Sequence, residues 1–208
     1  MNEISTTTWA RYIAIDRAAR AHPPAMLDCV RTIGRSLSLA ILVTLAAPTM
    51  AAQADPALAM VDTCFVPAEP CVGRIVAAID RAEHAIRVEA YGFSSKPILD
   101  ALLRGKGRQI DVQVILDRSD EAGQHRPLDI LREAGIPVWI DRAPGIAHIK
   151  TIIIDQHLDI SGSYNYTSSA ETRNVEDVTF TDSAEIANRF LHNWLGRRDA
   201  PTTTAVPP

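Results

Sequence analysis

The chain of 208 residues carries 25 acidic and 21 basic side chains, has a formal net charge of −4, and is 47% hydrophobic. This length allows one domain with a substantial hydrophobic core. The negative charge excludes the globally basic surface that proteins binding nucleic acid usually carry, so any such footprint must be local.

The first 54 residues predict an N-terminal extension that ends in a secretory signal at about residues 26–54. Arg31 and Arg35 supply the positive start of such a signal, and the apolar run at residues 37–47 is followed by small residues that form an A-x-A cleavage site. The apolar run is shorter than the roughly 20 residues needed to cross a bilayer. We therefore expect no stable membrane anchor and a periplasmic or secreted protein.

Two features of this N-terminal segment leave alternatives open. The 25 residues before Met26 are long for the start of a signal and include acidic residues, so Met26 is an alternative to Met1 as the true start. The apolar run also fits a buried core helix. Removal of residues 1–54 leaves 22 acidic and 16 basic side chains, which gives the remaining chain a net charge of −6.

The segment at residues 55–71 is a leader that contains Cys64 and Cys71, with six residues between them. An even pair of cysteines in an exported chain predicts a disulfide that closes a small loop. Two free buried thiols and half of a metal site are the alternatives. A zinc site usually needs a further pair of Cys or His ligands nearby, which this segment lacks.

From residue 72 to residue 198 the hydrophobic pattern alternates between strand and helix periodicity. This alternation predicts an α/β fold in one domain, in which a mixed, mostly parallel β-sheet is sandwiched between helices. The Pro- and Thr-rich tail at residues 199–208 is expected to be disordered. Helices are expected at residues 72–84, 97–103, 128–134 and 184–195, and strands at residues 85–93, 110–116, 138–140, 150–155, 158–161 and 177–181.

One short segment gathers the groups that phosphate chemistry needs, in the pattern H-x-K-x4-D-x6-G-S-x-N. His148 and Lys150 lie two residues apart on an expected strand, so the imidazole and the ammonium point to the same side. Asp155 is an odd number of positions from His148, so its side chain is expected to face the other way. We expect Asp155 to anchor the structure rather than to take part in the chemistry.

The second half of the pattern follows the next expected strand. Gly162 allows the backbone to approach a ligand closely. Ser163 and Asn165 again share one face, so a hydroxyl and a carboxamide are presented together. The alternative for Ser163 and Asn165 is an ordinary role in a turn.

This pattern resembles the mark of the phospholipase D superfamily, and it matches at every motif position. The chain is most similar to the small bacterial nuclease branch, which consists of exported enzymes with a single motif. The resemblance covers roughly residues 72–198 and includes residues 91–94, 168–177 and 190–194. It implies a metal-independent phosphodiesterase, in first place a nonspecific endonuclease of DNA, or of DNA and RNA.

The resemblance also implies how the nucleophile works. His148 attacks the phosphorus and forms a covalent phosphohistidine. Glu176 accepts a hydrogen bond from the other ring nitrogen, which fixes the tautomer and leaves Nε2 free to attack. The neighbouring Asp177 is the alternative for this orienting role.

The same resemblance assigns the remaining motif residues to substrate binding. Lys150, Ser163 and Asn165 hold the phosphate oxygens and stabilise the charge that develops in the transition state. The covalent route supplies a nucleophile and charge stabilisation without a cation, and the sequence contains no H-E-x-x-H motif or Cys/His cluster. We therefore expect no cofactor and no metal.

The single copy of the motif has a structural consequence. One histidine must be neutral to attack, and a second must be protonated to donate to the leaving oxygen. The other candidates, His84, His125, His157 and His192, lack the following lysine. We therefore predict a two-fold homodimer in which His148 and its mate form one active centre.

The catalytic groups alone do not choose the substrate, because lipids and nucleic acids present the same phosphodiester. A phospholipase D-type phosphatidyl hydrolase or transferase acting on phospholipid is the alternative, and the net charge of −6 favours it slightly. A nucleic-acid-binding module that has lost catalysis is the third hypothesis, and the intact motif argues against it.

Overall fold

The computed structural model of the protein describes residues 59–121 and 127–207. The signal predicted at residues 26–54 lies outside these residues. The elements in chain order are β1 (Met60–Val66), α2 (Cys71–Asp80), β2 (Ala85–Ala90), α3 (Lys96–Gly107), β3 (Asp111–Asp117), the 3₁₀ turn η1 (Arg118–Glu121), α4 (Pro127–Glu133), β4 (Val138–Asp141), β5 (Lys150–Ile154), β6 (Leu158–Gly162), α5 (Ser168–Thr172), β7 (Glu176–Asp182), α6 (Ala184–Arg198) and β8 (Thr203–Ala205).

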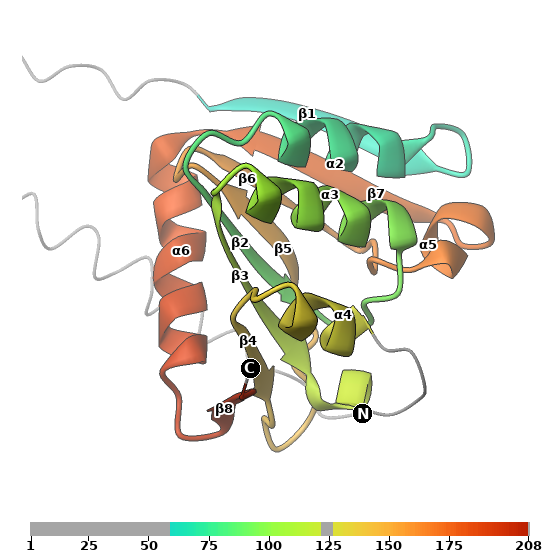
Figure 1. The fold of residues 1–208 in the computed structure, drawn as a ribbon. Coiled ribbons are helices and arrows are strands. Elements are labelled where there is room, and N and C mark those ends of the chain that lie inside the picture. The colour runs from blue at the N-terminus through green and yellow to red at the C-terminus, as the bar shows by residue number, and fades with distance from the viewer. Residues whose placement is uncertain (1–58, 122–126, 208) are drawn as a thin grey trace, which may run out of the picture. The chain divides into compact units, whose positions relative to one another are not determined.

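The strands form one mixed sheet in the order β1-β7-β6-β5-β2-β3-β4-β8 (Figure 1). The mixed sheet flanked by helices confirms the predicted fold class. The expectation of a mostly parallel sheet was wrong, because within the described residues only the pairs β2–β3 and β3–β4 are parallel. The strands β5 and β6 are joined by a turn at Asp155 and Gln156, both with positive φ, and such a short connection joins only antiparallel neighbours.

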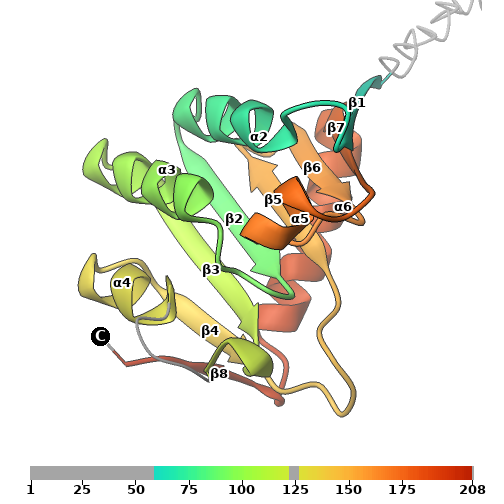
Figure 2. The ribbon, with the colours of Figure 1, turned by 90° about the vertical axis from the view of Figure 1, so that its right-hand side faces the viewer.

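Helices cover both faces of the sheet (Figure 2). The helices α2, α3 and α4 lie on one face, and α6 crosses the other. The strand β5 is buried along its whole length, and its isoleucines alternate between the two layers. Ile152 and Ile154 pack toward α2 and α3, whereas Ile153 packs toward Trp194 of α6. Within the described residues, no helix has the length and apolar character needed to span a membrane.

The predicted leader and tail both belong to the sheet. The leader forms the edge strand β1, which pairs with β7, and its disulfide between Cys64 and Cys71 confirms the predicted pairing. The tail was predicted to be disordered, but β8 pairs with β4, and the amide N–H of Val206 donates to the carbonyl of Val138 at 2.8 Å. The three residues of β8 are too few to show an alternation of apolar and polar residues, although its threonines favour strands.

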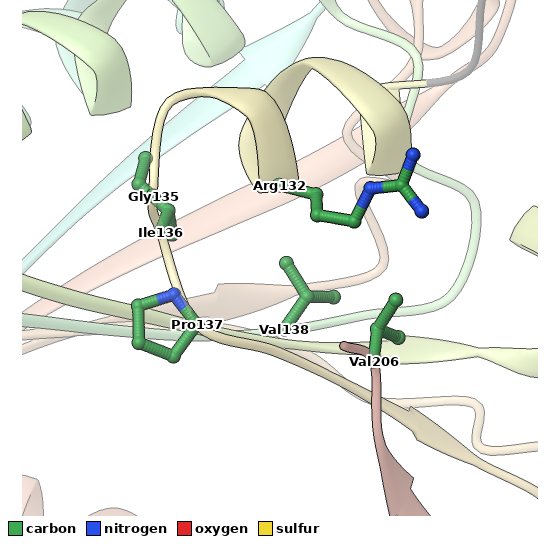
Figure 3. A pocket seen from close by; sticks show the side chains of 6 residues that line it. All are labelled: Arg132, Gly135, Ile136, Pro137, Val138 and Val206. Carbon is green, nitrogen blue, oxygen red and sulfur yellow. The ribbon is translucent and has the colours of Figure 1, made fainter. Parts of the chain in front are cut away.

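A small cavity marks the place where the tail meets α4 and β4 (Figure 3). Its volume is about 230 Å³. It lies at β4 and the tail, and β2 and β3 separate β4 from β5 in the sheet, so it forms no part of the motif. Its lining residues are Arg132, Gly135, Ile136, Pro137, Val138 and Val206.

Candidate active site

The motif residues lie together at one edge of the sheet, which is formed by the ends of four strands. The strand β5 is antiparallel to β2 and β6, and β7 is antiparallel to β6, so the ends of β2 and β6 lie beside the starts of β5 and β7. His148 precedes β5 by two residues, and Lys150 is its first residue. Ser163 directly follows β6, and Glu176 begins β7.

The rings of Tyr91 and His148 and the ammonium of Lys150 form the centre of the site. The ring centroids of Tyr91 and His148 are 4.7 Å apart in an edge-on arrangement. The Nζ atom of Lys150 lies 5.3 Å from the Tyr91 centroid and donates to the carbonyl of His148 at 3.2 Å. His148 and Lys150 are therefore presented on one side of the strand, with Ile149 between them.

Lys150 is buried, with 6% of its surface exposed, whereas His148 is exposed. Burial lowers the pKa of the Lys150 ammonium, and the carboxylate of Glu176 opposes that shift. Among the described residues the carbonyl of His148 is the one hydrogen-bond acceptor of Nζ. An ammonium has three N–H donors, so Lys150 can still donate to phosphate oxygens.

Ser163, Asn174 and Glu176 form a hydrogen-bonded group beside this centre. The Ser163 hydroxyl donates to Glu176 Oε2 at 2.5 Å and accepts the amide N–H of Asp177 at 3.1 Å. Asn174 donates to the other oxygen of Glu176 at 2.7 Å. No hydrogen bond joins Glu176 to the His148 ring within the described residues of a single chain, so the orienting role of Glu176 stays a prediction.

Two glycines allow the close approach of the segments that carry the site. Gly162 has a φ of +150°, and a Cβ atom there would lie 2.3 Å from the Asp177 carbonyl oxygen. Gly92 has a φ of +75° and packs beside Asn165. The Oδ1 atom of Asn165 is buried and has no hydrogen-bond partner among the described residues. This oxygen only accepts hydrogen bonds, so the group of Asn165 that can donate to a phosphate oxygen is its Nδ2 amino group.

Asp155 lies at the other end of β5 and anchors the chain there. Its carboxylate accepts the backbone N–H groups of Glu83, His84 and Ala85, each at 2.8 Å. Burial raises the pKa of Asp155, but the three hydrogen bonds outweigh that effect and lower it. The motif therefore combines residues at the site with a residue that fixes the strand on which they lie.

The side chains of Tyr164 and Tyr166 do not reach the site surface. Each is 2% exposed, so neither offers a face for stacking a base. The carbonyl of Tyr166 accepts the N–H groups of Ser94 and Ser95, which ties the segment after Gly92 to the motif. Tyr91, which contacts His148 and Lys150, is a site residue that the spacing of the motif did not reveal. It directly follows β2, a strand with clear alternation of apolar and polar residues.

Positive charge at this edge is local. Arg118 follows β3, Arg173 follows α5, and both are exposed. Arg142 is instead paired with Glu121 at 2.7 Å. His125 lies outside the described residues. Among the residues that the structure describes, no cluster of His, Cys, Asp or Glu has the arrangement of a metal site.

Comparison with known proteins identifies the family. The family model described as "Cardiolipin synthase, PLD-like domain" matches residues 75–195, which is more than half of the chain. The chain belongs to the phospholipase D superfamily. It is therefore related to enzymes that hydrolyse or transfer groups at phosphodiester bonds, and the H-x-K motif lies inside the matched region.

Individual members of the superfamily support this assignment. A protein named phospholipase D from Rickettsia felis is 44% identical over 138 residues, which are 66% of this chain and 69% of that protein. The human mitochondrial cardiolipin hydrolase is 31% identical over 63% of this chain and 52% of its own length. The crystal structure of a phospholipase D family member, Nuc from Salmonella typhimurium, has a TM-score of 0.67 at 28% identity and covers 73% of this chain and 100% of that chain.

Proposed function

We propose that this protein is a metal-independent phosphodiesterase that cleaves DNA, or DNA and RNA, as a nonspecific endonuclease. The observation that carries the proposal is the placement of His148 and Lys150 side by side against Tyr91, at the same sheet edge as Ser163 and Asn165. A nucleophile, a cation and neutral polar groups then surround one phosphate.

In this mechanism Nε2 of His148 attacks the phosphorus, and the bond from phosphorus to the leaving oxygen breaks. The His148 of a second copy gives its proton to the leaving oxygen. That imidazole then takes a proton from water, the water oxygen attacks the phosphorus, and the phosphorus–nitrogen bond breaks. Lys150 and Asn165 hold the nonbridging oxygens, whose negative charge increases in each transition state.

Two observations support a nucleic acid as the substrate. Arg118 and Arg173 are exposed at the sheet edge that carries the motif, so a chain of net negative charge has cations on both sides of the site. The motif and its flanking residues also resemble the small bacterial nucleases. A polyanion with many phosphates gains more binding free energy from separated cations than a single lipid headgroup does.

A phosphatidyl hydrolase or transferase is the second candidate. The relative from Rickettsia felis is named phospholipase D. In addition, two apolar side chains are exposed near the site, with 53% exposure for Ile146 and 87% for Val175. Exposed apolar residues beside a catalytic group suit contact with a lipid surface.

Incubation of the purified protein with supercoiled plasmid DNA, and separately with phosphatidylcholine and cardiolipin vesicles, separates the two candidates. We expect nicked and linear DNA in the presence of EDTA, no release of headgroup or phosphatidic acid, and no cleavage by His148→Ala. Lipid turnover without DNA cleavage would assign the second candidate. A gel shift without any cleavage would assign an inactive binding module, and loss of activity in EDTA that magnesium restores would contradict the metal-independent route.

The homodimer is a separate prediction, because one H-x-K motif provides one of the two histidines. Sedimentation should give a dimer. In mixed dimers that combine a wild-type copy with a His148→Ala copy, isolated by two different affinity tags, we expect almost complete loss of activity. Two independent sites would instead keep half of the activity, and an active monomer would contradict the shared centre.

We also propose that the protein works in the periplasm or outside the cell. The disulfide between Cys64 and Cys71 supports this location, because such bonds persist in oxidising compartments. The predicted secretory signal at residues 26–54 supports it independently. Fractionation of cells that produce the full chain tests the proposal, and retention in the cytoplasm would contradict it.

A further inference from the structure

Tyr91 contacts both groups that the proposed mechanism needs most. Its ring centroid is 4.7 Å from that of His148 and 5.3 Å from Nζ of Lys150. Tyr91 is not part of the motif, which begins 57 residues later at His148. The contact comes from the pairing of β2 with β5.

We propose that Tyr91 is a positioning residue that keeps the Lys150 ammonium charged and holds the His148 ring in place, an inference that rests on the proposed function. The face of an aromatic ring attracts a cation within about 6 Å of its centroid. The edge-on contact with the imidazole is a favoured arrangement of two aromatic rings. One side chain thus couples the nucleophile to the cation.

The surroundings of Lys150 show why such support matters. The side chain is buried and has lost most of its hydration, and a buried ammonium tends to release its proton. The groups that face it are the carboxylate of Glu176, the carbonyl of His148 and the ring of Tyr91. The carboxylate also accepts hydrogen bonds from Ser163 and Asn174, and the ring of Tyr91 adds to its stabilisation of the ammonium.

The surroundings of His148 also point to Tyr91 as a supporting residue. Its ring is exposed and makes no hydrogen bond with the described residues of its own chain. The edge-on contact with the Tyr91 ring therefore restricts its rotation within one chain. Tyr91 is itself fixed, since its N–H donates to the Ile149 carbonyl at 2.9 Å, in the middle of the H-x-K segment.

The ring of Tyr91, and not its hydroxyl, supports Lys150 and His148. Tyr91→Phe, which keeps the ring, and Tyr91→Leu, which removes it, therefore form a matched pair of variants. With bis(4-nitrophenyl) phosphate as the substrate, we expect Tyr91→Phe to retain the wild-type kcat within about threefold. We expect Tyr91→Leu to lower kcat by roughly ten- to a hundredfold. The pKa of the Lys150 ammonium itself, followed by NMR of its labelled Cε atom, should fall by about one pH unit in Tyr91→Leu.

A second measurement keeps the inference open to test if Tyr91→Leu fails to fold. Phenylalanines with one, two and three ring fluorines at position 91 keep the shape but weaken the attraction of the ring for a cation. The pKa of the Lys150 ammonium, measured in the same way, should then fall with each fluorine. A wild-type Lys150 pKa and a wild-type rate in the folded Leu variant, or an unchanged Lys150 pKa across the fluorinated series, would overturn the inference. Activity that survives His148→Ala would instead overturn the proposed function.

Discussion

Replacement of His148 by alanine is expected to lower kcat/KM for phosphodiester hydrolysis by roughly 10⁴-fold or more, because the covalent route has no other nucleophile. The side chain is exposed, so its removal leaves no buried cavity and the thermal unfolding midpoint should not change. Hydrolysis of bis(4-nitrophenyl) phosphate and nicking of plasmid DNA both measure this loss.

His192→Ala is the matched control, because His192 is also exposed but lies on α6 and lacks a lysine two positions later. It should keep wild-type activity. Rapid quenching of the wild-type protein with labelled substrate in alkaline denaturant, where the phosphorus–nitrogen bond survives, should trap a phosphorus-labelled histidine that is absent from His148→Ala. Retention of a tenth or more of the activity in His148→Ala would exclude His148 as the nucleophile.

The second large effect concerns stability. Glu89 is the penultimate residue of β2 and is 1% exposed, and neither of its oxygens has a hydrogen-bond partner among the described residues. Burial, together with a smaller effect of the nearby Asp141, raises the pKa of its carboxyl from 4.5 to about 7, although Arg197 opposes the shift. The folded protein therefore favours the neutral carboxylic acid.

This shift makes the folded state less stable as the pH rises. The unfolded chain releases the Glu89 proton near pH 4.5, whereas the folded chain keeps it until about pH 7. The free energy of unfolding should therefore fall between these two values, by on the order of 3 kcal/mol in total, and stay low above pH 7. The contribution is fully present only below pH 4.5.

Glu89→Gln tests this directly, because the amide has nearly the same shape and cannot ionise. Urea unfolding from pH 5 to pH 9 should show similar stability for the two proteins at pH 5, and a variant that is more stable by about 1–3 kcal/mol at pH 9. Glu185→Gln, an exposed change on α6, is the matched control and should follow the wild type. Parallel curves for Glu89→Gln and wild type would refute the ionisation of Glu89.

The sequence predicted most elements because their hydrophobic periodicity is local. Residues 150–155 were expected as a strand, and the structure has β5 there, buried along its whole length. The order and polarity of the strands depend instead on contacts between distant segments. The edge strands β1 and β8 were missed for a related reason, since an edge strand buries one face at most and gives a weak pattern.

The same distinction applies to the site. The two-residue spacing of His148 and Lys150 was sufficient to place them on one face. The contact of Tyr91 with both side chains requires the pairing of β2 with β5, which no local spacing encodes. Likewise, the engagement of Glu176 by Ser163 and Asn174 arises where β6 and β7 meet, so it could not be read from the motif.

The position of the two edge strands has a consequence for recombinant expression. A fragment cut to the matched region, residues 75–195, would lack both β1 and β8. It would lose both cysteines of the disulfide, and it would leave the outer backbone groups of β7 and β4 without partners. Unprotected strand edges promote aggregation. A soluble fragment should therefore begin before Met60 and extend past Val206, beyond the boundaries that similarity alone defines.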